Sequence, residues 1–259
     1  MSSAADDIEY PSTLAPLTEV RAVLEVATFF AYRSLLKKMS PEGDGHTVFT
    51  LPPFMSDDKF MSPMRKYLQS LGYDASGWEL EQNTGFDDDK FKLLANKISR
   101  VSSKTGKKIS LIGHSLGGIY ARLLAHEIPD AVRQVIYLGT PFNISDEQSV
   151  DLPIRRIYEK VNPTGQHSEM MQFTVDKGAT PMPSTAIYSE GDGFVPWRFC
   201  VDEEDDVTEN IRVSGSHTGL PFNLPVLFAV ADRLSQPEED WQPFAIDGVG
   251  QCLYGSKSA

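Results

Sequence analysis

The 259-residue sequence has few cysteines, a deficit of basic side chains and no long apolar run. Its two cysteines, Cys200 and Cys252, are too few and too far apart for a disulfide framework or a zinc site. Lysine and arginine total 24 against 36 acidic residues, which leaves a formal net charge of −12. This balance argues against nucleic acid or an anionic membrane surface as the main partner.

Other familiar signals are also missing. No apolar run approaches transmembrane length, so we expect no integral membrane association. The first residues, MSSAADDIEY, are polar and acidic, unlike a signal peptide, and favour a cytoplasmic protein. A cleaved export signal would leave the same sequence. Because no phosphate loop, dinucleotide fingerprint or metal-ligand cluster is visible, we expect neither a cofactor nor a metal.

What the sequence does contain is an alternation of strand-like and helix-like segments. Its strands are near-continuous apolar runs, which is typical of a mostly parallel sheet covered by helices on both faces. We therefore predict a single α/β domain over residues 1–259, with an N-terminal helical extension over 1–45. Residues 142–183 are rich in proline with broken periodicity and are interpreted as a cap insertion. The expected strands are 46–51, 74–80, 107–113, 132–142, 184–193 and 210–215, and the expected helices are 14–38, 59–73 (with Pro63 in its first turn), 86–106, 116–129 and 221–235.

The segment GHSLG at residues 113–117 matches the pattern G-x-S-x-G. A strand pattern directly precedes it and a helix pattern directly follows it, which is the setting of a nucleophile elbow. The glycines allow a turn so tight that flanking side chains would collide with the strand and the helix. Ser115 is therefore the candidate nucleophile, held in strained backbone with its Oγ clear of the sheet.

A serine hydroxyl is a poor nucleophile unless a base accepts its proton. In this kind of site the chain order is serine, acid, histidine, so the base should follow Ser115. His217, in the loop-like stretch VSGSHTGLPF after an expected strand, is the favoured base. The other histidines are less suitable: His46 precedes the nucleophile, His114 lies inside the motif, His126 lies within the next helix, and His167 lies in the expected cap.

The acid that orients the histidine should lie between the serine and the histidine in the sequence. Asp192 stands between two glycines at the end of an expected strand, where the backbone can turn sharply and present the carboxylate. Glu190 and Asp146 remain alternatives. The acidic run at 202–206 is interpreted as an exposed loop.

Together these segments resemble the lipase- or esterase-like members of the α/β-hydrolase superfamily. GHSLGGIYAR, YLGTPF, IYSEGDGFVPW and GSHTGL are similar to that family's elbow, post-elbow strand, acid loop and histidine loop, over residues 48–234. The resemblance implies the α/β-hydrolase fold, with Ser115 as nucleophile, Asp192 as acid and His217 as base. It also implies attack on a carbonyl, an acyl-serine intermediate and release to water or another acceptor.

The same resemblance implies an oxyanion hole made by two backbone N–H groups. One belongs to the residue after the nucleophile, Leu116. The other comes from the loop after an early strand, where this chain has two prolines, at 52 and 53, which carry no N–H. The second donor is then Phe54, with Met55 as the alternative.

We expect an apolar pocket around this site, lined by Met55, Phe142, Phe194 and Trp197. The leading hypothesis is a hydrolase of carboxylic esters with fairly hydrophobic acyl groups, acting on a small-molecule or lipid-like ester. An acyltransferase using the same residues and a catalytically silent binding protein remain alternatives. A nucleophilic-aspartate enzyme is disfavoured because residue 115 is serine.

Overall fold

Six strands form one parallel sheet in the order β2-β1-β3-β4-β5-β6 in the computed structural model of the chain. The structure describes residues 19–142, 178–246 and 250–254. All six strands overlap the segments expected to be strands, and the predicted mostly parallel sheet is confirmed. The strands are β1 (Thr47–Leu51), β2 (Asp74–Gly77), β3 (Ile109–His114), β4 (Val132–Leu138), β5 (Ser184–Ser189) and β6 (Thr208–Val213).

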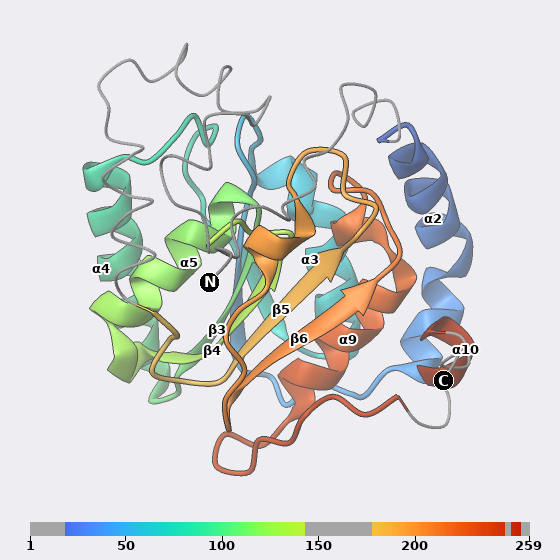
Figure 1. Cartoon of the computed structure of the whole chain (residues 1–259). Coiled ribbons are helices and arrows are strands. Elements are labelled where there is room, and N and C mark those ends of the chain that lie inside the picture. Colours follow the sequence, from blue (N-terminus) through green and yellow to red (C-terminus); the bar gives the residue numbers. More distant parts are fainter. Residues whose placement is uncertain (1–18, 143–177, 247–249, 255–259) are drawn as a thin grey trace, which may run out of the picture.

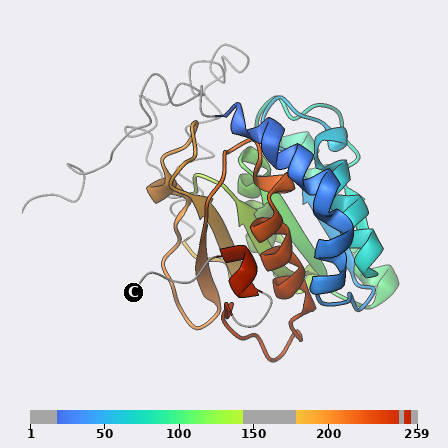
Figure 2. The same ribbon diagram turned by 90° about the vertical axis from the view of Figure 1, so that its right-hand side faces the viewer.

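Helices cover both faces of this sheet (Figure 1). One face carries α4 (Asp88–Thr105) and α5 (Leu116–Glu127). The other face carries α2 (Arg21–Met39), α3 (Asp58–Leu71) and α9 (Leu224–Ser235), and Figure 2 shows α2 lying along the outside of this layer. The shorter elements are α10 (Gly250–Tyr254) and the 3₁₀ turns η2 (Pro129–Ala131), η3 (Trp197–Cys200) and η4 (Leu220–Phe222).

The strand residues alternate between two apolar cores, as the period of two requires. On β3, Leu111 packs on the side of α4 and α5, whereas Ile112 packs on the side of α2, α3 and α9. On β4, Tyr137 and Ile136 divide in the same way. Burial on both faces explains why these strands are apolar at nearly every position.

Local signals set the helix ends. Asp57 and Asp87 cap α3 and α4 by accepting backbone N–H bonds, and Gly72 ends α3 in the left-handed conformation. The expected place of Pro63 in the first turn of α3 was wrong. The helix begins at Asp58, so Pro63 is its sixth residue and lies inside it.

Two expectations about surface segments have different outcomes. The proposed cap insertion falls mostly on residues 143–177, which lie outside the described residues. The acidic run at 202–206 is only partly an exposed loop, because the Asp202 side chain is 9% exposed and pairs with Arg122 at 2.6 Å. A buried cation on α5 draws this carboxylate inward, which charge clustering alone did not indicate.

Candidate active site

The turn from β3 into α5 is centred on Ser115. This residue has φ 52° and ψ −121°, a combination that a residue with a side chain rarely adopts. Its backbone N–H donates to the carbonyl of Leu138 at the end of β4, at 2.9 Å. Strained backbone of this kind persists only when the surroundings enforce it, and it is concentrated at functional sites.

Close backbone contacts enforce the turn. A Cβ on Gly113 would collide with the backbone of Gly117 and Gly118, so strand and helix could not approach as they do. A Cβ on Gly117 would collide with the Leu51 carbonyl oxygen at the end of β1. The glycines of the motif thus bring three backbone segments together at the carboxyl edge of the sheet.

Asp192 and His217 meet at this edge from the loops that follow β5 and β6. The Asp192 Oδ2 to His217 Nδ1 distance is 2.5 Å, and the two residues are only 8% and 6% exposed. The other carboxylate oxygen of Asp192 accepts the backbone N–H groups of Phe194 and Val195, both at 2.8 Å. The aspartate is therefore held in one orientation and fixes that of the imidazole.

Residues next to Ser115 contact His217. His114, the residue before Ser115, places its Nε2 3.0 Å from the carbonyl oxygen of His217, and the two imidazole centroids are 5.0 Å apart. The backbone N–H of Ser115 bonds Leu138, and the next residue, Gly139, lies beside the His217 ring. No hydrogen bond joins Ser115 Oγ to His217 among the described residues. Contacts of this type are often long until substrate is bound.

The alternative residues have other partners where the structure describes them. Glu190 is half exposed and pairs with Arg212 at 3.1 Å. His46 lies at the opposite end of β1, where its ring contacts Asp44 and Ser110. Asp146 and His167 lie outside the described residues.

The pKa of His217 is raised above its ordinary value. Burial lowers the pKa of this imidazole, but the charge and hydrogen bond of Asp192, together with the charge of Glu19, outweigh burial. The neighbouring His114 is different, because burial and the charge of His217 hold its pKa well below the usual range. His114 is thus neutral at pH 7, and His217 is the imidazole suited to accept and hold a proton.

The two predicted oxyanion donors lie on segments that approach each other at Gly117, namely the start of α5 and the loop after β1. Leu116 is the first residue of α5, and the loop after β1 carries Phe54. Asn83 supports this loop, since its side chain donates to the carbonyl of Pro52 and its carbonyl accepts the N–H of Met55 at 2.7 Å. The N–H of Met55 is thereby engaged in a hydrogen bond, and Phe54 as the second donor stays a prediction.

The four predicted pocket residues have different surroundings. Phe194 packs edge-on against the His217 ring, with the ring centroids 5.7 Å apart, and Met55 is 44% exposed. Phe142 is buried against Tyr137 and Arg122, and Trp197 stacks on Tyr188. Phe194 is thus the one in direct contact with a proposed catalytic side chain.

Sequence reasoning missed the contribution of α2 to this site. The Glu19 carboxylate, just before α2, accepts the backbone N–H groups of Gly193, His217 and Thr218 at 3.0, 2.9 and 2.8 Å. It thereby joins the aspartate loop to the histidine loop. These N–H bonds outweigh burial and lower the pKa of Glu19.

Two further α2 side chains support the same loops. The Glu25 carboxylate accepts the N–H of Ser216 and the side-chain amide of Asn223. The Arg21 guanidinium donates to the carbonyls of Gly191 and Gly215, at 2.6 and 3.1 Å. No motif surrounds these residues, so the sequence carried no signal of this role.

In the part of the chain that the structure describes, no group of three or more His, Cys, Asp or Glu side chains could hold a metal ion. Among the same residues, no helix is long and apolar enough to cross a membrane.

Comparison with known proteins identifies the fold of the chain. A family model described as a PGAP1-like alpha/beta domain matches residues 83–179. No curated protein sequence matches the chain. Aspergillus fumigatus lipase B is similar with a TM-score of 0.63 and 16% identity, over 82% of this chain and 57% of that one. The chain thus spans little more than half of the length of that lipase.

Two shorter lipases match over most of their length. For Bacillus licheniformis lipase BlEst2 the TM-score is 0.55 at 16% identity, over 74% of this chain and 94% of that one. For a soluble variant of Saccharomyces cerevisiae monoglyceride lipase the TM-score is 0.54 at 15% identity, over 76% and 89%. The resemblance expected from the motifs is confirmed at the level of the fold. The chain is an α/β-hydrolase-fold protein whose structure is similar to those of lipases.

Proposed function

We propose that the protein hydrolyses carboxylic esters through an acyl-serine intermediate, with Ser115 as nucleophile, His217 as base and Asp192 as the orienting acid. The observation that carries the proposal is the buried hydrogen bond between Asp192 and His217. It lies at the same edge of the sheet as a serine in left-handed backbone. An aspartate that holds Nδ1–H leaves Nε2 as the acceptor that a serine nucleophile needs.

In the proposed reaction, His217 Nε2 takes the proton of Ser115 as Oγ attacks the ester carbonyl. The negative charge on the tetrahedral oxygen is met by the N–H groups of Leu116 and Phe54. Collapse of this intermediate expels the alcohol, which takes the proton from His217 and leaves acyl-Ser115. Water then repeats the sequence, and the carboxylic acid is released. Asp192 stabilises the imidazolium that forms in both halves.

The proposed substrate is an ester with a fairly hydrophobic acyl group. Phe194 against the His217 ring offers apolar contact near the reacting atoms, and the exposed Met55 follows the proposed oxyanion donor Phe54 in the sequence. The lipases among the structural neighbours support a lipid-like ester.

A fluorophosphonate probe tests the nucleophile. We expect stoichiometric labelling of the wild type, loss of labelling in Ser115→Ala and His217→Ala, and full labelling in Ser103→Ala, which changes an exposed serine of α4. Folding of each variant is checked by circular dichroism. If the folded wild type is not labelled, neither hydrolysis nor acyl transfer by this site can be correct.

Nitrophenyl esters of increasing chain length test the pocket. We expect kcat/KM to rise beyond the acetyl ester. A maximum at acetyl would refute the apolar pocket while leaving the nucleophile intact. Release of nitrophenol only in the presence of an added alcohol, with the acyl group recovered as a new ester of that alcohol, would favour the acyltransferase alternative.

A further inference from the structure

The outward face of α2 is apolar. Six large apolar side chains at this helix are at least half exposed, among them Val23 at 68%, Leu24 at 69% and Phe30 at 50%. A helix on the surface of a globular protein normally turns its polar side to water. The complete set is Val20 (directly before α2), Val23, Leu24, Phe30, Tyr32 and Leu35.

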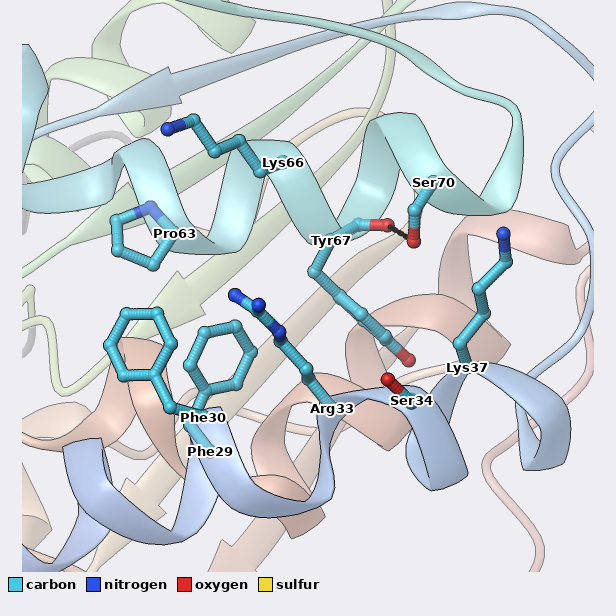
Figure 3. A pocket seen from close by; sticks show the side chains of 9 residues that line it. All are labelled: Phe29, Phe30, Arg33, Ser34, Lys37, Pro63, Lys66, Tyr67 and Ser70. Carbon is cyan, nitrogen blue, oxygen red and sulfur yellow. Dashed lines mark hydrogen bonds between the residues drawn. The ribbon is translucent and has the colours of Figure 1, made fainter.

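A groove of about 330 Å³ lies between α2 and α3, next to these side chains (Figure 3). Its floor is aromatic, with Phe29 and Tyr67 both buried. Arg33 extends from α2 toward α3 across the middle of the groove, and Lys37 and Lys66 flank it. The groove therefore combines apolar surface with three cationic side chains.

These cations lack carboxylate partners among the described residues, where no ion pair includes Arg33, Lys37 or Lys66. The recorded contact of the Arg33 guanidinium is with the ring of Phe30, at 5.2 Å. None of the residues that line the groove is acidic. Basic side chains outnumber acidic ones on α2 and α3, although the whole chain carries 36 acidic and 24 basic residues. Charge complementarity therefore points to an anionic ligand at this surface.

We propose that α2 and the α2–α3 groove form a surface that binds anionic phospholipid membranes. Arg33, Lys37 and Lys66 bind headgroup phosphates, and Leu24 and Phe30 enter the boundary between headgroups and acyl chains. Apolar side chains beside lysine and arginine on one helix suit a helix that lies in the plane of a membrane surface. Lysine and arginine can also bury their stems in this region while their charged ends stay in the headgroup layer.

The net charge of −12 led us to expect no binding to an anionic membrane surface. A local group of cations can nevertheless bind such a surface. Electrostatic attraction to a membrane falls off within a Debye length of about 8 Å at physiological ionic strength. Only the side chains that face the bilayer then matter, and the charged side chains that line the groove are all cations.

The place of α2 gives this surface a consequence for the candidate site. Glu19, which bonds the N–H of His217, is followed directly by Val20 and then by α2. The apolar face thus begins beside the loops that carry Asp192 and His217. Membrane binding would hold the carboxyl edge of the sheet close to lipid. Because binding is measured without turnover, the inference stands apart from the proposed function.

Co-sedimentation with vesicles tests it. We expect the wild type to bind vesicles of phosphatidylcholine mixed with phosphatidylserine, and to bind pure phosphatidylcholine much less. The triple variant Arg33→Glu, Lys37→Glu, Lys66→Glu should bind the anionic vesicles at least about 100-fold more weakly, since each cation near such a surface contributes about 1 kcal/mol. The matched control reverses three exposed cations of α4, on the opposite face of the sheet, and should bind as the wild type does: Lys92→Glu, Arg100→Glu, Lys104→Glu.

A second pair of changes tests the apolar contribution. Val23→Ser with Leu24→Ser should weaken binding to the anionic vesicles about tenfold, because apolar area no longer leaves water. The proposal is overturned if the folded wild type does not bind anionic vesicles, or if the α2–α3 and α4 charge reversals weaken binding equally. It is also overturned if the wild type is a dimer that the serine changes dissociate, without any vesicle binding. The face would then belong to a second copy of the chain.

Discussion

Removing the charge of Glu19 is expected to loosen the loops that carry Asp192 and His217 and to lower the pKa of the His217 imidazole. The Glu19 carboxylate is 9% exposed and accepts three backbone N–H groups, one from the aspartate loop and two from the histidine loop. Glu19→Ala leaves these three donors without an acceptor. Glu19→Gln keeps the shape of the side chain but replaces the charge and one acceptor oxygen with an amide nitrogen.

The size of the effect follows from these bonds. A buried donor left without a partner costs about 1–3 kcal/mol. Since three donors share one carboxylate, the losses are not additive. We therefore expect Glu19→Ala to lower the free energy of unfolding by about 3–5 kcal/mol and Glu19→Gln by about 1–3 kcal/mol. The control Glu81→Gln changes an exposed carboxylate and should stay within about 0.5 kcal/mol of the wild type.

The ionisation of Glu19 makes the free energy of unfolding depend on pH. The pKa of Glu19 is lowered on folding, so its contribution to stability is present above its unfolded value of about 4.5 and is lost as the pH falls through the lower folded value. Glu19→Gln should remove this part of the acid sensitivity. The charge of Glu19 also raises the pKa of His217, so the His217 imidazole should titrate at lower pH in Glu19→Gln than in the wild type.

Urea unfolding at several pH values, NMR titration of His217 and the pH dependence of kcat/KM measure these effects. Because the neutral imidazole is the base, the rising limb of the rate profile should move to lower pH in Glu19→Gln. A purely structural role would lower stability without moving this limb. Unchanged stability together with an unchanged His217 titration would refute the reasoning.

Three further outcomes follow from the contacts around the site and the core. Asp192→Asn should keep the fold and lower kcat on the order of 10⁴-fold, because an amide favours the wrong imidazole tautomer; circular dichroism and ester turnover check both parts. Gly117→Ala should lower the free energy of unfolding by about 1–3 kcal/mol, since its Cβ would push the Leu51 carbonyl away; thermal unfolding measures this. Asp202→Ala should destabilise the protein by about 3–5 kcal/mol, because it leaves the buried Arg122 unpaired. The corresponding Glu190→Ala breaks an exposed pair and should cost less than about 1 kcal/mol.

Much of the fold could be predicted because its determinants are local. Apolar runs marked β1, β3 and β4, and helical periodicity marked α3 and α4. The expected place of Pro63 in the first turn of α3 was wrong, because Pro63 is the sixth residue of a helix that begins at Asp58. The burial of Asp202 was also missed, because its ion-pair partner on α5, Arg122, is 80 residues away in the sequence.

The candidate residues divide in the same way. Ser115 could be found because a tight turn needs glycines at fixed spacing, and His217 and Asp192 because they follow strands that end at one edge of a parallel sheet. Only the tertiary structure distinguishes Asp192 from Glu190, since both residues follow β5 in the same stretch. Only the structure joins Asp192 to the imidazole and leaves Glu190 on the surface with Arg212.

By itself, the sequence determined the order of elements, the parallel sheet and the strained turn at Ser115, because each depends on periodicity or on backbone freedom within a few residues. The tertiary structure alone decided that Glu19, 198 residues from His217 in sequence, bonds its backbone N–H. It also decided that apolar side chains of α2 are exposed beside Arg33, Lys37 and Lys66, which form no ion pair with another described residue. Contacts between distant segments depend on how helices pack on the sheet. The residue pattern within one segment does not indicate which other segment it will contact.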